Sequence, residues 1–98
     1  MDRDTALQIL KNHKRDLNSL GVIHVSLFGS LARGESTSRS DVDVAVRFAP
    51  EVRPTLVRLV LIEQTLADWF DKPVDLIKEP ARKPELQSHI ERDAIRAF

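Results

Sequence analysis

The chain has 98 residues, 42% of them hydrophobic and 31% charged, which is ordinary for one globular domain and excludes a largely disordered chain. Fifteen basic residues balance fifteen acidic ones, so the zero net charge gives no electrostatic reason to expect nucleic-acid binding. The absence of cysteine excludes disulfides and thiolate metal sites, and there is no signal peptide or membrane-length apolar run, so we expect a single cytoplasmic domain over residues 1–98.

The N-terminal part of the chain reads as a helix followed by a strand. Apolar residues at helical spacing predict a helix over residues 4–20, and Gly21 is a natural stop. His13 lies in its apolar stripe, and we interpret it as a half-buried packing residue rather than a metal ligand. β-Branched and aromatic residues then predict a strand over 22–28. Alternation places three of its apolar residues on one face: Ile23, Val25 and Leu27.

A polar connection separates this strand from a second one. Gly29 and Ser30 end the first strand, a short helix over 31–33 follows, and residues 35–40 read as a loop. The second strand, over 41–48, alternates cleanly between two faces. One face carries Val42, Val44, Val46 and Phe48, and the other carries Asp41, Asp43, Ala45 and Arg47.

Three more elements follow in the second half of the chain. We expect a helix over 55–70, a short strand over 74–77 and a last helix over 85–97. The resulting order of helices and strands predicts an α/β (α+β) domain with a small mixed sheet of about three strands, covered by helices.

Asp41 and Asp43 are the first candidates for chemistry. Side chains two residues apart on a strand share a face and lie roughly 6.5–7 Å apart. Two carboxylates this close repel each other unless a cation neutralises them, and hard oxygen ligands select Mg²⁺ or Mn²⁺. Two solvated acids at a strand edge are the alternative. However, aspartate is depleted in strands, and these two interrupt a valine-rich one.

Gly29 and Ser30 lie where the first strand gives way to a helical turn, and Ser30 is eleven residues before Asp41. A glycine there lets backbone amides approach a ligand closely, and N–H groups at a helix start attract phosphate. Gly-Ser alone is more often a plain turn. A phosphate-binding turn beside a metal-binding acid pair indicates a nucleoside triphosphate, while the phosphate-loop pattern Gly-x-x-x-x-Gly-Lys-Ser/Thr is absent.

Residues 29–35, GSLARGE, followed by residues 40–46, SDVDVAV, resemble the signature of the DNA polymerase beta-like nucleotidyltransferase superfamily. Within it, the short length is similar to that of the minimal nucleotidyltransferases, which are the antitoxin partners of HEPN-domain toxins. The resemblance implies the nucleotidyltransferase fold and a third carboxylate on a later strand. Asp75 matches that carboxylate, whereas the competing Asp71 precedes Pro73 and reads as loop.

The same resemblance implies a role for each site residue. Asp41 and Asp43 hold two Mg²⁺ ions, and Gly29 and Ser30 hold the β- and γ-phosphates of ATP. Asp75 helps to bind the metal near the attacking hydroxyl and accepts its proton. The sequence leaves the roles of two arginines open. Arg33 neutralises triphosphate charge or pairs with Glu35 or a strand-end acid, and Arg47 lies at the edge of the site or pairs with a structural acid.

Larger relatives carry an added domain that grips the acceptor, so the resemblance implies that a partner chain supplies it here. The helix over 55–70 is apolar around most of its circumference, which predicts a second buried surface unless the terminal helices cover it. We expect an antitoxin that transfers AMP from ATP to a hydroxyl, with tyrosine favoured, of a HEPN toxin. The alternatives are an antitoxin that acts by binding alone and a small-molecule (antibiotic) nucleotidyltransferase. A homo-oligomer is a further possibility, and neither membrane nor nucleic acid is an expected partner.

Overall fold

The computed structural model, which describes residues 1–35, 37 and 40–98, contains a sheet with the strand order β3-β2-β1-β4. The strands are β1 (Val22–Phe28), β2 (Val42–Phe48), β3 (Val74–Lys78) and β4 (Ile95–Arg96). β2 is parallel to β3 and antiparallel to β1, and β1 is antiparallel to β4. The predicted α/β class and mixed sheet are confirmed, with one strand more than the three expected.

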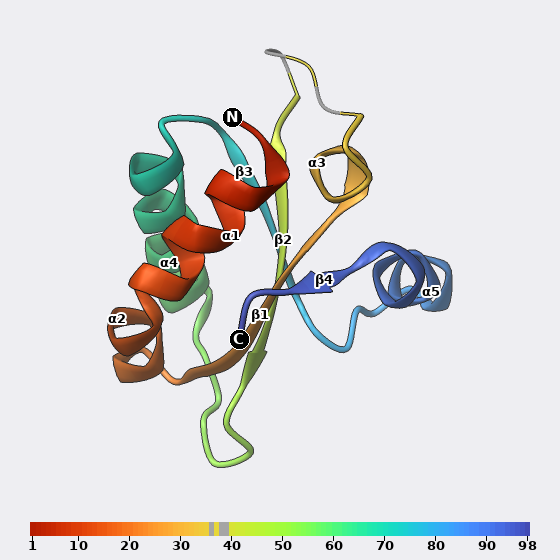
Figure 1. Cartoon of the computed structure of the whole chain (residues 1–98). Coiled ribbons are helices and arrows are strands. Elements are labelled where there is room, and N and C mark those ends of the chain that lie inside the picture. The colour runs from red at the N-terminus through yellow and green to blue at the C-terminus, as the bar shows by residue number, and fades with distance from the viewer. Residues whose placement is uncertain (36, 38–39) are drawn as a thin grey trace.

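Helices cover both faces of the sheet, which forms the middle of three layers (Figure 1). One face is covered by α1 (Arg3–Asn12), α2 (Lys14–Ser19) and α4 (Leu56–Phe70), and the other by α5 (Pro84–Asp93). α3 (Gly29–Ala32) lies at the end of β1, and its buried Leu31 and Ala32 join the same core as α1 and α4. The larger core lies on the α4 side and includes fully buried Leu10, Leu17, Val25, Leu27, Val44, Ile62 and Leu66. A smaller core under α5 is formed by Phe28, Ala45 and Ile90. None of the described helices is long and apolar enough to cross a membrane.

The ends of two helices follow local capping chemistry. Asp2 caps α1 by accepting a hydrogen bond from the Thr5 N–H at 2.7 Å. Thr55 caps α4 in the same way, accepting from the Arg58 N–H at 3.1 Å. α4 ends where Asp71 adopts a left-handed conformation with φ of 54°, a common way to stop a helix. The predicted helix over 55–70 is therefore confirmed to within one residue.

The predicted helix over 4–20 is wrong in one respect, because it is two helices that meet at His13. The backbone of His13, at φ −106° and ψ 18°, leaves the helical region. Its ring stacks on Trp69 of α4, with centroids 3.8 Å apart and planes inclined by 10°. The half-buried packing role expected of His13 is thus confirmed. No glycine or proline at this point marks the break in the sequence.

β1 contains a β-bulge at Ile23 that the alternation pattern did not predict. The pairing of β1 with β2 shifts register between Val22 and His24, which leaves Ile23 as the extra residue. Ile23 is exposed, whereas Val22 is fully buried. The expectation that Ile23 lies on the same face as Val25 and Leu27 is therefore wrong.

The predicted last helix over 85–97 is also wrong at its C-terminal end. α5 stops at Asp93, and the next residues form β4, in which Ile95 pairs with Leu27 and Arg96 with Ser26. β4 covers backbone groups of β1 that would otherwise lie on an open edge. This pairing brings the end of α5 to the same end of the sheet as the turn after β1.

The predicted loop over 35–40 includes Ser36, Ser38 and Arg39, which lie outside the described residues. Ser40 closes a turn at its end. The Ser40 Oγ accepts a hydrogen bond from the Thr37 N–H at 2.9 Å, and the Ser40 N–H donates to the Thr37 carbonyl at 3.1 Å.

Candidate active site

Asp43 and Asp75 lie side by side on neighbouring strands. The parallel register pairs Asp43 of β2 with Asp75 of β3, and such strands run about 4.8 Å apart. Val74 and Leu76 pack into the larger core, so the side chain of Asp75 faces the other side of the sheet, as expected. Asp41 directly precedes β2. The sheet thus gathers the three predicted acids at the end where β1 passes into α3.

The competing acid, Asp71, does not join this group in the strand register. It is the C-terminal cap of α4 and precedes β3, in the connection that the sequence predicted as loop. Among the two candidates, only Asp75 is paired with an acid of β2.

Gly29 packs directly against the Asp43 carboxylate. Phe28, the last residue of β1, pairs with Asp43, so the following residue enters the turn beside that side chain. Gly29 has a φ of 72°, and a Cβ at this position would collide with the carboxylate, at 3.0 Å from its Cγ and closer still to Oδ2. Glycine is required both by the backbone conformation and by the close approach. The Gly29–Ser30 turn, which the sequence predicts to bind phosphate, is therefore in direct contact with Asp43 of the acid pair.

Ser30 lies in the first turn of α3, immediately after β1. The cap residue Phe28 has no hydrogen-bonding side chain, so it does not satisfy the amides that begin α3. The turn is held from its carbonyl side: the Arg33 N–H donates to the Gly29 carbonyl at 3.1 Å, and the Glu35 N–H donates to the Ser30 carbonyl at 2.8 Å. This arrangement suits a site in which backbone amides meet an anion.

The two arginines left open by the sequence have defined partners. The Arg33 Nε donates to Glu35 at 3.1 Å, and its NH1 group donates to Asp93 at 2.9 Å. Arg47 pairs with Glu79 at 3.3 Å, so its interpretation as the partner of a structural acid is confirmed. The sequence did not single out Asp93, and only the unpredicted β4 pairing could have pointed to it.

The electrostatics of the acid group centre on Asp43, which is half-buried. Burial raises the pKa of the Asp43 carboxyl, and the charges of Asp75 and Asp41 raise it further, while Arg33 opposes them. Asp75 therefore acts on Asp43 more strongly than its sequence neighbour Asp41 does, as the strand register requires. A bound cation would relieve this repulsion.

The donor chemistry of these acids fits Mg²⁺, which prefers oxygen ligands. The carboxylates of Asp41, Asp43 and Asp75 supply such oxygens at one end of the sheet. In the part of the chain that the structure describes, no three His, Cys, Asp or Glu side chains converge into a ready-made metal cluster. The fit thus rests on the donor type, the like-charge repulsion at Asp43 and the contact with Gly29.

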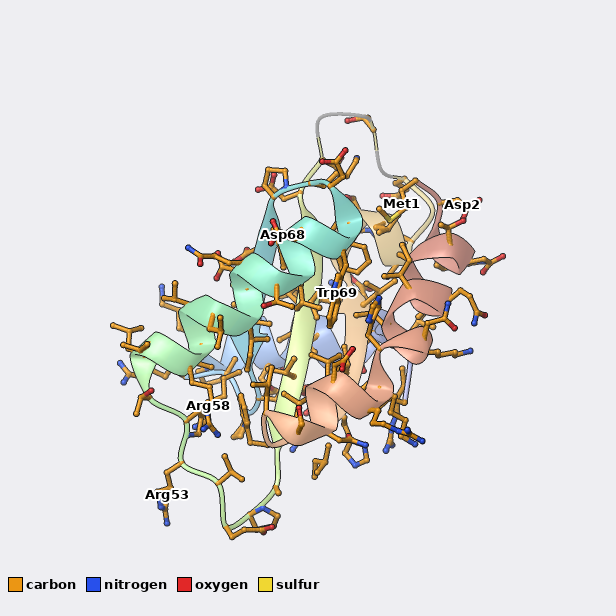
Figure 2. All side chains as sticks on the ribbon, turned by 90° about the vertical axis from the view of Figure 1, so that its left-hand side faces the viewer. Met1, Asp2, Arg53, Arg58, Asp68 and Trp69 are labelled. Carbon is orange, nitrogen blue, oxygen red and sulfur yellow. The ribbon has the colours of Figure 1, made fainter. Side chains whose placement is uncertain are left out.

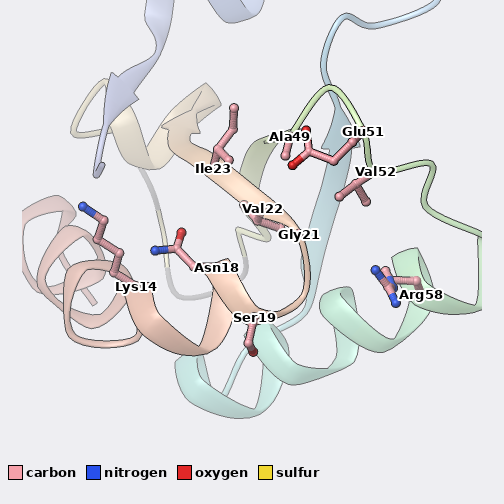
Figure 3. Close-up of a pocket in the computed structure, with 10 residues that line it drawn as sticks. All are labelled: Lys14, Asn18, Ser19, Gly21, Val22, Ile23, Ala49, Glu51, Val52 and Arg58. Atoms are coloured by element: carbon pink, nitrogen blue, oxygen red, sulfur yellow. The ribbon is translucent and has the colours of Figure 1, made fainter.

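A hollow of about 600 Å³ lies at the opposite end of β1, lined by residues that include Lys14, Gly21, Glu51 and Arg58 (Figure 3). It shares no lining residue with the acid group or the Gly29–Ser30 turn. Both of its cations already have contacts: Lys14 lies over the Phe98 ring, and Arg58 donates to a backbone carbonyl. It is therefore separate from the candidate active site.

α4 exposes an apolar face on the side of the sheet opposite to the acid group. Leu56 is 76% and Val57 79% exposed, and with Val60, Leu61 and Gln64 they line a shallow hollow of about 370 Å³. α1 packs beside α4 around Trp69, as Figure 2 shows, but it does not cover this stretch. The helix predicted over 55–70 was expected to keep an apolar surface that the terminal helices do not cover. The exposed face of α4 confirms this expectation.

Comparison with known proteins agrees with the fold described above. A family model described as a nucleotidyltransferase domain matches residues 10–97. Protein adenylyltransferase MntA of Thermococcus cleftensis is 33% identical over 88 residues, which cover 89% of this chain and 87% of that protein. A provisionally named protein adenylyltransferase of Methanocaldococcus jannaschii is 34% identical over 90 residues, 90% of each chain.

Solved structures share the fold over nearly the whole chain. One, provisionally named as a minimal nucleotidyltransferase, has a TM-score of 0.79 at 29% identity and covers 97% of this chain and 95% of its own. Another, of a tri-AMPylated Shewanella oneidensis HEPN toxin in complex with MNT antitoxin, has a TM-score of 0.68 at 21% identity, covering 94% of this chain and 71% of that one. The matched domain, the curated relatives and the fold together show that this chain belongs to the nucleotidyltransferase domain family.

Proposed function

We propose that this chain is an Mg²⁺-dependent protein adenylyltransferase that transfers AMP from ATP to a hydroxyl group of a HEPN-domain toxin and so neutralises it. Its relatives are named protein adenylyltransferases, and chains of the same fold occur in structures of toxin–antitoxin complexes, one of them with AMP-PNP. The observation that carries the proposal is the register that pairs Asp43 with Asp75 directly beside the Gly29 turn. The proposal places the protein in the cytoplasm, where ATP is available as donor.

Each site residue takes one part in binding the donor. Gly29 and Ser30 hold the β- and γ-phosphates through the turn at the start of α3. Arg33, whose charge reaches Asp43, adds positive charge at the triphosphate. Asp41 and Asp43, with Asp75, are the ligands for two Mg²⁺ ions, which when bound would stabilise negative charge on the attacking and leaving oxygens.

The transfer itself is a single in-line displacement. The acceptor hydroxyl oxygen forms a bond to the α-phosphorus, and the bond from the α-phosphorus to the oxygen that bridges it to the β-phosphate breaks. Pyrophosphate leaves with that bonding pair, and the hydroxyl proton passes to the Asp75 carboxylate. Asp75 is exposed at the end of the sheet, where the side chain of a partner can reach it. Tyrosine is the acceptor that we expect.

The exposed α4 face is the surface that we assign to the partner. It shares no residue with the acid group, so a toxin bound there leaves the candidate active site open. The same face also supports the second candidate function, in which the chain neutralises its toxin by contact alone.

Mass measurement separates these two functions. The chain is incubated with ATP, Mg²⁺ and a candidate HEPN-domain toxin, and the intact mass of the toxin is recorded. An added mass of one or more adenylyl groups, absent with the Asp43→Asn variant, supports transfer. A toxin that is inhibited without any change in mass, and is still inhibited by Asp43→Asn, shows that binding alone is the function.

A further inference from the structure

The side chain of Asp93 contacts Arg33 although the two residues are 60 positions apart in the sequence. Arg33 follows α3, and Asp93 is the last residue of α5. The Arg33 NH1 group donates to Asp93 Oδ2 at 2.9 Å, and Arg92 Nε donates to Asp93 Oδ1 at 3.4 Å. The Asp93 side chain is only 12% exposed, whereas Glu35, the other partner of Arg33, is mostly exposed. Asp93 is thus the more firmly placed of the two carboxylates.

The position of Asp93 follows from the pairing of β4 with β1. Ile95 pairs with Leu27 and the strands are antiparallel, so residues before Ile95 run alongside residues after Leu27. Those residues are the end of β1 and the turn at Gly29. The fold therefore brings the end of α5 to the candidate nucleotide site, although α4 and β3 separate α5 from the signature in the sequence.

The contacts of Arg33 leave part of its guanidinium available. A guanidinium has five N–H donors in a planar fork. The bonds to Glu35 and Asp93 use the Nε–H and one N–H of NH1, and in the described residues the remaining donors have no protein partner. Those donors have the geometry that suits phosphate oxygens. A carboxylate on one side of the fork restricts the rotamers of this flexible side chain before any ligand arrives.

We propose that Asp93 is a positioning residue for nucleotide binding, which holds Arg33 so that its remaining N–H groups meet the triphosphate. The inference rests on the proposed function, because it takes ATP as the donor and Arg33 as a phosphate contact. It extends the nucleotide site to the end of α5, outside the Gly29–Ser30 turn and the acids of β2 and β3. Without Asp93, the one carboxylate left to Arg33 among the described residues is Glu35, which is two residues away and mostly exposed.

The chain contains a matched control pair in Arg47 and Glu79. Glu79 is 10% exposed and accepts a hydrogen bond from the more exposed Arg47 at 3.3 Å, so its burial and ion pairing resemble those of Asp93 with Arg33. In the strand register, Arg47 of β2 lies opposite His24 of β1, far along the strand from Gly29. Glu79→Gln therefore removes a comparable ion pair away from the candidate site.

The experiment measures the dissociation constant of MgATP by calorimetry for variants of the full chain. We expect Asp93→Asn to weaken MgATP binding by about fivefold or more, and Asp93→Glu to restore part of the loss. Arg33→Gln weakens binding as well, and adding Asp93→Asn to it has no further effect, because Asp93 acts through Arg33. Glu79→Gln leaves MgATP binding unchanged.

Three outcomes overturn the inference. The first is an Asp93→Asn variant that binds MgATP as the wild type does. The second is a loss on Asp93→Asn that is equally large in the Arg33→Gln background, which would show a general structural role. The third is an equal loss in Glu79→Gln. If the wild-type chain itself fails to bind MgATP, the proposed function fails and this inference with it. If Asp93→Asn does not fold, MgATP affinity is compared between Asp93→Glu and the unchanged Asp93. This comparison is made once with Arg33 present and once with Arg33→Gln, and it decides the question.

Discussion

The backbone of Gly29 packs against the carboxylate of Asp43, so the turn after β1 and the second acid of the signature occupy adjoining space. The φ of 72° and the collision that a Cβ would make are independent reasons for glycine at this position. A side chain here would displace the Asp43 carboxylate, the turn or both. The two stretches of the signature, separated in the sequence, are therefore one structural unit.

We expect Gly29→Ala to abolish MgATP binding and to destabilise the fold by more than the about 1–2 kcal/mol that a left-handed conformation costs a non-glycine residue. Gly34→Ala is the matched control, because Gly34 has a φ of 74° with no atom within 4 Å of an added Cβ. It should show the conformational cost alone and keep its MgATP affinity. Urea unfolding and calorimetry measure the two effects. Equal losses in both variants would mean that the contact with Asp43 is unimportant.

Asp43→Asn and Asp75→Asn should each abolish or strongly reduce AMP transfer while the fold is kept. The neutral amide removes repulsion within the acid group, so neither variant should unfold more easily than the metal-free wild type. Asp71→Asn is the control, since Asp71 caps α4 and asparagine tolerates its left-handed conformation. Transfer is followed by the mass of the acceptor protein. Normal transfer by Asp75→Asn together with loss in Asp71→Asn would reverse the assignment of the third acid.

The Asp93–Arg33 ion pair should give a pH-dependent contribution to stability. Burial raises the pKa of the Asp93 carboxyl, but hydrogen bonds from Arg33 and Arg92 outweigh it, and the pKa lies below its ordinary value of 3.8. A lowered pKa in the folded state stabilises the fold above the unfolded pKa, and this stabilisation is lost as the pH falls through the folded pKa. Asp93→Asn should therefore be less stable than wild type at pH 7, and the difference should shrink towards pH 3. A difference in unfolding free energy that is constant over this range would contradict the prediction.

The exposed α4 face should be needed for the partner and not for the fold. Val57→Asp combined with Leu61→Asp should weaken the complex with the HEPN toxin and change the unfolding free energy by only about 0.5 kcal/mol per site. Ile23→Asp, an exposed apolar residue on β1, is the control and should leave the complex intact. Size-exclusion chromatography with light scattering reads the complex and any self-association of the chain. Loss of a homodimer rather than of the toxin complex would assign this face to a second copy.

Much of this fold could be predicted from local patterns. The alternation in β2 and the position of Asp75 in a short strand were enough to predict that the acids face away from the larger core, and the Gly-Ser turn was placed correctly at the end of β1. These features depend on period-two alternation and on turn chemistry, which are properties of neighbouring residues.

The features that were missed depend on contacts between distant segments. The bulge at Ile23 arises from the register with β2, and the break at His13 goes with its stacking on Trp69 of α4. β4 is only two residues long and forms because β1 offers a free edge, so its own residues, which continue a helical pattern, carry no strand signal. Asp93 was missed for the same reason, since its place beside Arg33 depends on that pairing.

The parallel pairing of β2 with β3 makes the acid group depend on the completed fold. Parallel neighbours cannot join through a tight hairpin, and here the chain crosses over through α4 to place Asp75 beside Asp43. A ligand that requires all of these segments binds only the completed fold. At a concentration of about 100 times its dissociation constant, it would add roughly 2.7 kcal/mol to the free energy of unfolding. The concentration of nucleotide and the stability of the folded chain would then be thermodynamically linked.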